Sequence, residues 1–336
     1  MKKIRLGRTE LQVTKTSFGV LPLQRVEMGE AVKILRKAYD SGINFYDTAR
    51  AYSDSEEKIG NALSDVRKDI IIASKSHAAD PVTLAAHLEA SLQKLKTDYI
   101  DILQLHNPDG PAIEKLYGAM VKAKEQGKIR FIGITNHKRG VALDAVWSKR
   151  FDTLQFPLSY ISDMQDLGII EQCRQDDVGV IAMKALCGGL ITNIPAAFAF
   201  LAQYDTVVPI WGMQREKELD QLLVLDRNPP VLDEAMQEQM KKDRAEMAGD
   251  FCRACGYCLP CAANINITMA ARMSLLLRRA PYQQFLEDSW YEQMMKIEKC
   301  TECGHCKANC PYELNTPELL KKNLADYKEF YKLHKK

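Results

Sequence analysis

Short apolar runs alternate with amphipathic stretches through the first two thirds of the chain. Eight apolar runs have the length of strands: 16–20, 43–46, 70–74, 99–105, 128–134, 153–156, 178–183 and 206–210. Between them lie stretches with the apolar spacing of helices, at 31–39, 56–63, 81–95 and 113–125. Alternating strands and helices predict a parallel sheet, and eight strands close into a (β/α)8 TIM barrel. Residues 4–6 and 11–13 are expected to form a hairpin at its floor.

The pattern changes after Asn228, where Pro229 and Pro230 follow each other. Two prolines cannot continue a helix or a central strand, so we expect the barrel to end there. Further helices are predicted at 231–247, 267–279 and 282–297. The 336 residues also exceed the roughly 250 residues of one barrel. We therefore expect three regions: a barrel in 1–228, a linker and helix in 229–249, and a small, mostly helical domain in 250–336.

Ionisable side chains stand at the ends of three successive predicted strands. Asp47, Lys75 and His106 each follow an apolar run, and Tyr52 lies shortly after the first of them. Each residue also has an ordinary structural interpretation. An aspartate after a strand often caps a helix, and the other three can be surface or packing residues. The carboxyl ends of barrel strands open on one face, where such side chains converge. Four of them in this order indicate an active site.

The fragments around these residues resemble the aldo-keto reductase family. They are AsnPheTyrAspThrAla around Asp47, AlaTyr-x-x-SerGlu from Ala51, IleIleAlaSerLys up to Lys75, and AspIleLeuGlnLeuHis up to His106. The resemblance covers about residues 1 to 225 and implies hydride transfer between NADPH or NADH and a carbonyl or alcohol substrate. It makes Tyr52 the general acid and Lys75 the group that favours its phenolate. Asp47 would then hold Lys75, and His106 would orient the substrate oxygen.

Eight residues are candidate contacts of the nicotinamide cofactor: Gly19, Thr135, Asn136, Gln155, Met183, Gly212, Met213 and Arg215. A glycine at position 19 would let a flat ring approach the backbone, although a turn glycine is the alternative. The resemblance implies that Thr135, Asn136 and Gln155 hold the carboxamide; without it, a helix cap and a barrel-lining amide are the ordinary alternatives. Met183 stands where many members carry a stacking aromatic residue.

The same resemblance places the cofactor phosphates after the eighth strand, at the N-terminus of a helix that begins near Arg215. The usual pattern of phosphate-binding residues is incomplete there. The choice between NADPH and NADH therefore stays open.

Eight of the ten cysteines lie in two groups near the carboxyl end: Cys252, Cys255, Cys258 and Cys261, then Cys300, Cys303, Cys306 and Cys310. The second group has the ferredoxin spacing C-x2-C-x2-C-x3-C-P, whose fourth cysteine commonly ligates the other cluster. We therefore expect two 4Fe-4S clusters, one on Cys252, Cys255, Cys258 and Cys310 and one on Cys300, Cys303, Cys306 and Cys261. Zinc generally takes two C-x2-C pairs separated by a longer loop, so the even spacing favours clusters.

This cysteine module resembles the ferredoxin-type tail that one branch of the family carries. Cys173 and Cys187 fall outside both groups and are expected to be ordinary buried thiols.

Composition and charge restrict the partners. Lys and Arg number 46 against 44 Asp and Glu, which gives no reason to expect nucleic acid or an anionic membrane. No apolar run is long enough for a signal peptide core or a membrane span, so we expect a cytoplasmic protein. A small carbonyl or alcohol is the expected partner.

Three functions are compatible with these motifs. The first is a hydride-transferring oxidoreductase. The second is an electron-transfer protein that links NAD(P)H to a redox partner protein through the clusters, although hydride carries two electrons and each cluster takes one. The third is a nicotinamide-binding redox sensor or regulatory subunit, since this kind of fold is reused for non-enzymatic roles. The complete set of four catalytic-type residues favours the first.

Overall fold

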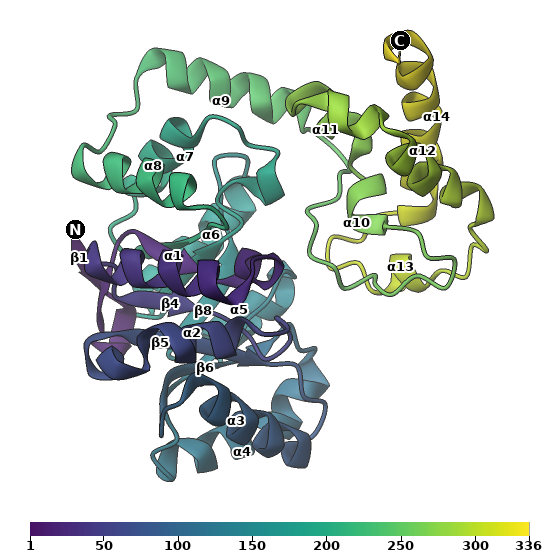
Figure 1. Cartoon of the computed structure of the whole chain (residues 1–336). Helices are drawn as coiled ribbons and strands as arrows, with labels where there is room; N and C mark the ends of the chain where they lie inside the picture. Colours follow the sequence, from purple (N-terminus) through teal and green to yellow (C-terminus); the bar gives the residue numbers. More distant parts are fainter. Residues whose placement is uncertain (336) are drawn as a thin grey trace. The chain divides into compact units, whose positions relative to one another are not determined.

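The computed structural model describes residues 1–335 and divides into two compact units (Figure 1). The first, called the barrel unit, comprises Met1–Ala185 and Pro195–Leu232. The second, called the cysteine unit, comprises Leu186–Ile194 and the chain from Asp233 onward. Three regions were predicted, and two units are found. Of the predicted linker and helix in 229–249, residues 229–232 fall in the barrel unit and 233–249 in the cysteine unit, which also takes Leu186–Ile194. Residue 336 of the predicted third region lies outside the described residues.

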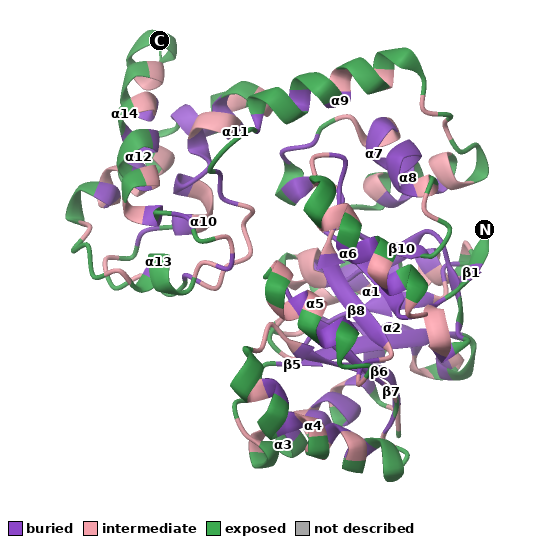
Figure 2. Cartoon of the chain, turned by 180° about the vertical axis from the view of Figure 1, so that it is seen from behind, coloured by how far each residue is buried: buried purple, intermediate pink, exposed green. Residues whose placement is uncertain are grey.

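The barrel unit contains the predicted eight parallel strands in a closed ring of order β10-β3-β4-β5-β6-β7-β8-β9. The strands are β3 (Ser17–Gly19), β4 (Phe45–Asp47), β5 (Ile71–Ser76), β6 (Ile100–His106), β7 (Ile129–Thr135), β8 (Thr153–Pro157), β9 (Gly179–Met183) and β10 (Val207–Gly212). The (β/α)8 fold class predicted from the alternating pattern is thus confirmed. Every residue of β5 is buried, including Lys75, as in a sheet covered on both faces (Figure 2).

Helices follow the strands on the outside of the ring. They are α1 (Met28–Asp40), α2 (Ser55–Leu63), α3 (Pro81–Leu95), α4 (Gly110–Glu125), α5 (Arg139–Trp147), α6 (Met164–Gln175), α7 (Ile194–Ala202) and α8 (Glu216–Arg227). Their starts are set locally: Asp80 accepts hydrogen bonds from the backbone N–H groups of Val82 and Thr83, both at 3.0 Å. Asp109 and Asp163 cap α4 and α6 in the same way.

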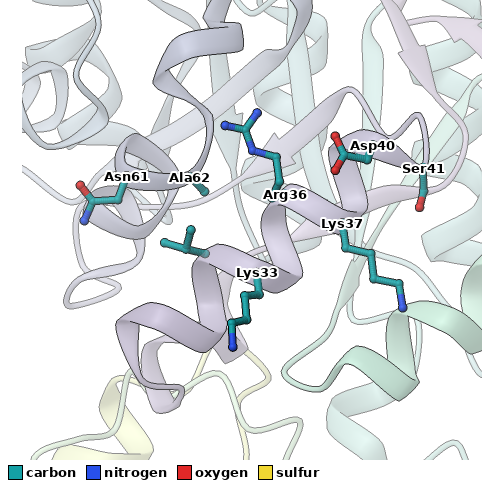
Figure 3. A pocket seen from close by; sticks show the side chains of 8 residues that line it. Lys33, Arg36, Lys37, Asp40, Ser41, Asn61 and Ala62 are labelled. Atoms are coloured by element: carbon teal, nitrogen blue, oxygen red, sulfur yellow. The ribbon is translucent and has the colours of Figure 1, made fainter.

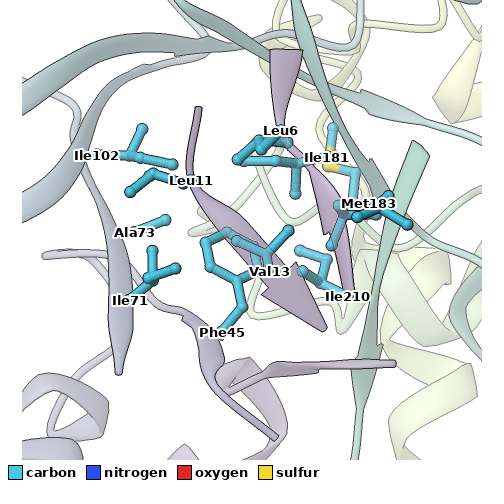
Figure 4. Packing of buried hydrophobic residues seen from close by; sticks show 12 residues of the cluster. Leu6, Leu11, Val13, Phe45, Ile71, Ala73, Ile102, Ile181, Met183 and Ile210 are labelled. Atoms are coloured by element: carbon cyan, nitrogen blue, oxygen red, sulfur yellow. The ribbon is translucent and has the colours of Figure 1, made fainter. Parts of the chain in front are cut away.

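A hairpin of β1 (Lys3–Arg5) and β2 (Gln12–Thr14) contributes apolar side chains to the core of the barrel. Its residues Ile4, Leu6, Leu11 and Val13 pack with inward-facing strand residues in one cluster (Figure 4). The strand members are Phe45, Ile71, Ala73, Ile102, Ile181, Met183, Val208 and Ile210.

The inward positions of three strands change from apolar to polar toward their carboxyl ends. Successive inward side chains are two residues apart in a strand. Phe45 is thus followed by Asp47, Ala73 by Lys75, and Ile102 first by Gln104 and then by His106. Apolar side chains therefore fill the barrel toward the amino ends of these strands, and the ionisable groups lie at the carboxyl ends.

The cysteine unit is mostly helical, as predicted. Its helices are α9 (Glu234–Glu246), α10 (Ile267–Ala270), α11 (Met273–Arg279), α12 (Asp288–Met295), α13 (His305–Ala308) and α14 (Thr316–His334), with 3-10 turns at Tyr282–Leu286 and Lys296–Lys299. Two predicted helices are broken. The stretch 267–279 is interrupted at Arg272, whose φ of −132° is not helical, and the stretch 282–297 is interrupted at Glu287, which is extended.

Helix α14 was not among the predicted elements, although its sequence carries the signals of a helix. A proline stands in its first turn, and Leu320, Leu324 and Tyr327 are buried at the spacing of one helical face. Among residues 1–335, no helix combines the length and the apolar character that crossing a membrane requires.

Candidate active site and cysteine cavity

A buried ion pair lies at the carboxyl end of the barrel strands. The Nζ atom of Lys75 is 2.6 Å from Oδ2 of Asp47 and 2.6 Å from the carbonyl oxygen of Thr48, to which it also donates. The Lys75 and Asp47 side chains are 0% and 3% exposed. Burial lowers the pKa of Lys75, and the carboxylate opposes that shift. Burial also raises the pKa of Asp47, against the effect of Lys75. Each group is the counter-ion that lets the other keep its charge.

Two glutamines hold the carboxylate from the other side. Nε2 of Gln104 donates to Oδ1 of Asp47 at 3.2 Å, and Nε2 of Gln155 lies 3.5 Å from Oδ2. Gln104 also donates to Oε1 of Gln155 at 2.9 Å and accepts from the hydroxyl of Thr135 at 2.7 Å. All of these side chains are buried. The network ties β4, β6, β7 and β8 together and fixes where the ion pair lies.

Tyr52 and His106 stand next to the ion pair. Their rings are 5.8 Å apart between centroids and nearly perpendicular, and Nζ of Lys75 lies 5.2 Å from the centroid of the Tyr52 ring. Both aromatic residues are half-buried, in contrast to Lys75 and Asp47. The structure thus brings the four predicted catalytic residues together, with the ion pair inside and the two ring groups toward solvent.

His106 is neutral at physiological pH. Burial, followed by the positive charge of Lys75 and the proximity of His77, lowers the pKa of His106 to about 3. A neutral imidazole has one N–H donor and one acceptor nitrogen. At this position it can donate a hydrogen bond to a substrate oxygen without carrying a charge.

Two buried polar residues near the site were not identified from the sequence as site residues. Gln104 lies opposite Lys75 in the register of β5 and β6. Its signal in the sequence was a polar side chain two residues before His106, hence on the same face of the strand. Glu56 is 1% exposed; it accepts from the Ser74 hydroxyl at 2.6 Å and lies 3.4 Å from Nη1 of Arg50. The first turn of α2 is joined to β5 by this hydrogen bond, and Arg50, in the segment that carries Tyr52, pairs with the same carboxylate.

The predicted cofactor residues lie at the carboxyl ends of their strands or in the next loop. Gly19 ends β3, and a Cβ atom there would meet the Trp211 carbonyl at 3.4 Å. Thr135 pairs with Gln155 in the register of β7 and β8. The Asn136 side chain donates to the Pro108 carbonyl and accepts from the Lys138 N–H, so it orders its own loop. Met183 ends β9, is 8% exposed and packs in the barrel core.

The segment predicted to bind phosphate leads into α8. Gly212 ends β10, and Met213 follows it and is buried. At the start of α8, Oε2 of Glu218 accepts hydrogen bonds from the backbone N–H groups of Gln214 and Arg215, at 2.8 and 3.2 Å. A carboxylate therefore already occupies two of the donors that an anion could use. The Arg215 side chain is exposed at this end of the helix.

A surface hollow where α1 and α2 meet contains none of the predicted site residues (Figure 3). It is lined by Val32, Lys33, Arg36, Lys37, Asp40, Ser41, Asn61 and Ala62. Arg36 pairs with Asp65, and Lys37 pairs with Glu216 and Asp220. The hollow is a feature of the outer helices, and the ionisable groups of the strand ends define the candidate active site.

Five cysteines line one cavity in the cysteine unit: Cys252, Cys255, Cys258, Cys306 and Cys310. The other residues around it include Ile267, Ala271 and Tyr312. Four of the five are the predicted ligands of the first cluster, with Cys310 arriving from the second motif. Cys261, Cys300 and Cys303 do not border this cavity, and Cys303 is exposed.

Cysteines gather around this cavity without converging on one point in the part of the chain that the structure describes. Four thiolates around one zinc ion would lie about 3.8 Å apart, given Zn–S bonds of about 2.3 Å. Among residues 1–335, no three His, Cys, Asp or Glu side chains converge closely enough for a metal ion. The five cysteines instead border one cavity. Burial and then the neighbouring thiols raise the pKa of Cys258, so thiolates here need a cationic partner.

Comparison with known proteins gives the family of the chain. Residues 14–196 match the Aldo/keto reductase family, and residues 251–315 match the 4Fe-4S dicluster domain. The chain therefore belongs to the aldo/keto reductase family and carries a region similar to a dicluster domain. The resemblance inferred from the motifs of both regions is confirmed.

Individual relatives are distant. The chain is 32% identical to L-galactose dehydrogenase of Arabidopsis thaliana over 218 residues, which are 56% of this chain and 66% of the relative. It is 29% identical over 210 residues to the uncharacterized oxidoreductase YqkF of Bacillus subtilis, covering 58% of this chain and 68% of that protein. The chain thus spans about two thirds of the length of these relatives.

Solved structures share the fold of the barrel. The holo form of aldo-keto reductase AKR11C1 from Bacillus halodurans has a TM-score of 0.65 at 22% identity, covering 72% of this chain and 96% of that one. An aldo/keto reductase from Klebsiella pneumoniae, solved in complex with NADP and acetate, has a TM-score of 0.62 at 24% identity, covering 72% and 94%. At these identities the likeness concerns the fold.

Proposed function

We propose that the barrel unit transfers hydride between a nicotinamide cofactor and a small carbonyl or alcohol. The observation that carries this proposal is the buried Lys75–Asp47 pair beside the half-buried ring of Tyr52. An ion pair removed from water at 2.6 Å is costly to maintain, and such arrangements gather where a protein needs a perturbed group. Membership of the aldo/keto reductase family supports the same reaction.

Each of the four residues has its own role in the reduction of the carbonyl group. Tyr52 gives its proton to the carbonyl oxygen, because it carries the acidic hydroxyl of the ring that stands next to Lys75. The Lys75 ammonium stabilises the phenolate that remains, and Asp47 keeps that ammonium in place. Neutral His106 donates a hydrogen bond to the same oxygen as negative charge develops on it. The cofactor, when bound, supplies the hydride.

The proposed cofactor site uses the loops that follow β3, β7, β8, β9 and β10. Thr135, Asn136 and Gln155 carry the hydroxyl and amide groups that a carboxamide requires. The structural neighbour from Klebsiella pneumoniae binds NADP, which favours NADPH for this chain. Because Glu218 occupies backbone donors at the start of α8, we expect Arg215 and the residues near it to rearrange around a phosphate.

The cysteine unit is proposed to hold two 4Fe-4S clusters. Cys252, Cys255, Cys258 and Cys310 border one cavity and would ligate one cluster; Cys300, Cys303, Cys306 and Cys261 would ligate the other. This crossed arrangement predicts that Cys310→Ser and Cys252→Ser damage the same cluster. Iron content and the electron paramagnetic resonance spectrum of each variant test it, and a Cys310→Ser protein that loses the cluster of Cys300 and Cys303 would exclude crossed ligation.

Replacement of Tyr52 tests the hydride-transfer proposal. Tyr52→Phe removes only the hydroxyl, so we expect kcat for carbonyl reduction to fall about 10²- to 10⁴-fold, as loss of a general acid does, with little change in NADPH binding. Tyr117→Phe is the matched control, because the Tyr117 hydroxyl bonds to the Arg150 carbonyl, which lies between α5 and β8. Unchanged turnover in Tyr52→Phe with a panel of aldehydes, ketones and keto-sugars would remove the assignment.

Electron transfer through the clusters is a second candidate, supported by the match of residues 251–315 to a dicluster domain. In that case the clusters connect the nicotinamide to an external redox partner protein. Anaerobic addition of NADPH alone, followed by electron paramagnetic resonance, separates the two candidates. A reduced-cluster signal supports electron transfer, and its absence with full carbonyl reductase activity supports hydride transfer alone.

A further inference from the structure

The segment Leu186–Ile194, called the strap, belongs to the cysteine unit although barrel strands precede and follow it in the sequence. It begins three residues after Met183, the last residue of β9. The chain therefore passes from one unit to the other three times, at 185–186, 194–195 and 232–233. Contacts that fix the strap therefore also restrict the conformations of residues 184 and 185, which connect it to β9.

Two arginines with largely buried side chains hold the backbone of the strap. Nη1 of Arg272 donates to the Gly188 carbonyl at 2.6 Å, and Nε of Arg279 donates to the Leu190 carbonyl at 2.8 Å. The Arg279 guanidinium is itself fixed by Oδ1 of fully buried Asp243 at 2.6 Å, an ion pair that links α9 and α11 (Figure 1). Hydrogen bonds from charged donors are stronger than neutral ones, so the strap is tied firmly to these helices.

The strap also packs on the first cysteine motif. A Cβ atom on Gly188 would lie 2.9 Å from Nη1 of Arg272, 3.5 Å from the Arg253 carbonyl oxygen and 3.6 Å from Cβ of Ala254. Arg253 and Ala254 stand between Cys252 and Cys255, and the Ala254 N–H donates to Sγ of Cys252 at 3.3 Å. The backbone that meets the strap is thus the backbone that presents proposed cluster ligands.

We propose that Arg272 and Arg279 are positioning residues for the cofactor site, which act by holding the strap against the first cysteine motif. Cluster ligands order that motif, because metal-ligand bonds supply much of the folding free energy of such short domains. Loss of the cluster or of an arginine contact therefore frees the strap and the chain end of β9. Cofactor binding must then order this segment again, and its affinity falls. The inference rests on the proposed cofactor contact at the end of β9.

Arg272→Met in the full-length holoprotein tests the proposal, with Arg278→Met as the matched control. Arg278 stands on α11, which begins directly after Arg272, but it binds Asp326 and the Ser274 carbonyl, so its loss spares the strap. Under anaerobic conditions and at equal iron content, we expect the NADPH dissociation constant to rise about tenfold in Arg272→Met and less than twofold in Arg278→Met. Hydrogen exchange in a peptide spanning 184–194 should accelerate only in the first, and also in cluster-free wild type.

Gly188→Ala provides a second variant in case Arg272→Met loses its clusters. Its methyl group would press on the Arg272 guanidinium, whereas Gly249→Ala adds the same atom, also at a positive φ, with nothing within 4 Å. The first should weaken NADPH binding and the second should not. Faster exchange of the strap with unchanged NADPH affinity would overturn the proposal while leaving hydride transfer intact. A wild-type holoprotein that binds no nicotinamide would overturn both.

Discussion

His106 makes the stability of the barrel sensitive to acid. In the folded protein its pKa is about 3, whereas an unfolded histidine takes up a proton near pH 6.5. Between these values the unfolded state binds more protons, so stability rises with pH and is lost as pH falls below about 6.5, by at most about 1.4 kcal/mol per pH unit. His106→Asn should flatten this slope. Urea midpoints at about pH 7 and about pH 5 measure it, with the exposed His334→Asn as control; equal slopes in all three proteins would contradict the assignment.

The Lys75–Asp47 pair should show strong non-additivity. Removing one partner of a buried ion pair leaves an uncompensated charge and costs about 3–5 kcal/mol. We therefore expect Lys75→Met and Asp47→Asn each to lower the free energy of unfolding by about this amount, while the double variant loses much less than the sum. A double-mutant cycle from urea denaturation gives the coupling free energy. A coupling near zero would mean that the two groups do not depend on each other for their charge.

At the scale of elements, the sequence predicted the strands and the strand-end chemistry because both follow from local pattern. Asp47, Lys75 and His106 each end an apolar run, and parallel strands must bring such positions together. Gln104 was missed because its one local signal, its position two residues before His106, does not show what it binds; its register against Lys75 does. The division of 267–279 was missed for a similar reason. Arg272 leaves the helical conformation where its side chain binds Gly188, 84 positions away in the sequence.

Two glycines of the barrel strands, Gly19 on β3 and Gly133 on β7, should respond differently to alanine. A Cβ atom at Gly133 on β7 would lie 2.4 Å from the Thr153 hydroxyl and 2.9 Å from Gln104, inside the network that holds Asp47. Overpacking of this kind costs about 1–3 kcal/mol. At Gly19 the nearest atom is at 3.4 Å, an ordinary contact. Gly133→Ala should therefore lower the melting temperature, and Gly19→Ala should keep it.

Gly19→Ala at the same time tests whether a cofactor approaches the end of β3. If the nicotinamide lies against this backbone, the added methyl group should raise the NADPH dissociation constant without changing the melting temperature. Fluorescence titration measures the first quantity and scanning calorimetry the second. Wild-type affinity in Gly19→Ala would leave position 19 as a turn glycine with no part in binding.

At the scale of the whole molecule, loss of the clusters should make the chain sensitive to protease at two separate places. The cysteine unit contains both Leu186–Ile194 and the chain after Asp233, so disorder in it exposes both. The barrel unit has its own core of eight strands and should stay folded. Thermolysin, which cleaves before leucine and isoleucine, should therefore cut cluster-free protein within the strap and after residue 233, while the holoprotein resists at both places. Mass spectrometry of the fragments locates the cuts. Cleavage confined to the chain after residue 233 would show that the strap keeps its order without the clusters, and that the segment after β9 belongs with the barrel as the sequence alone suggested.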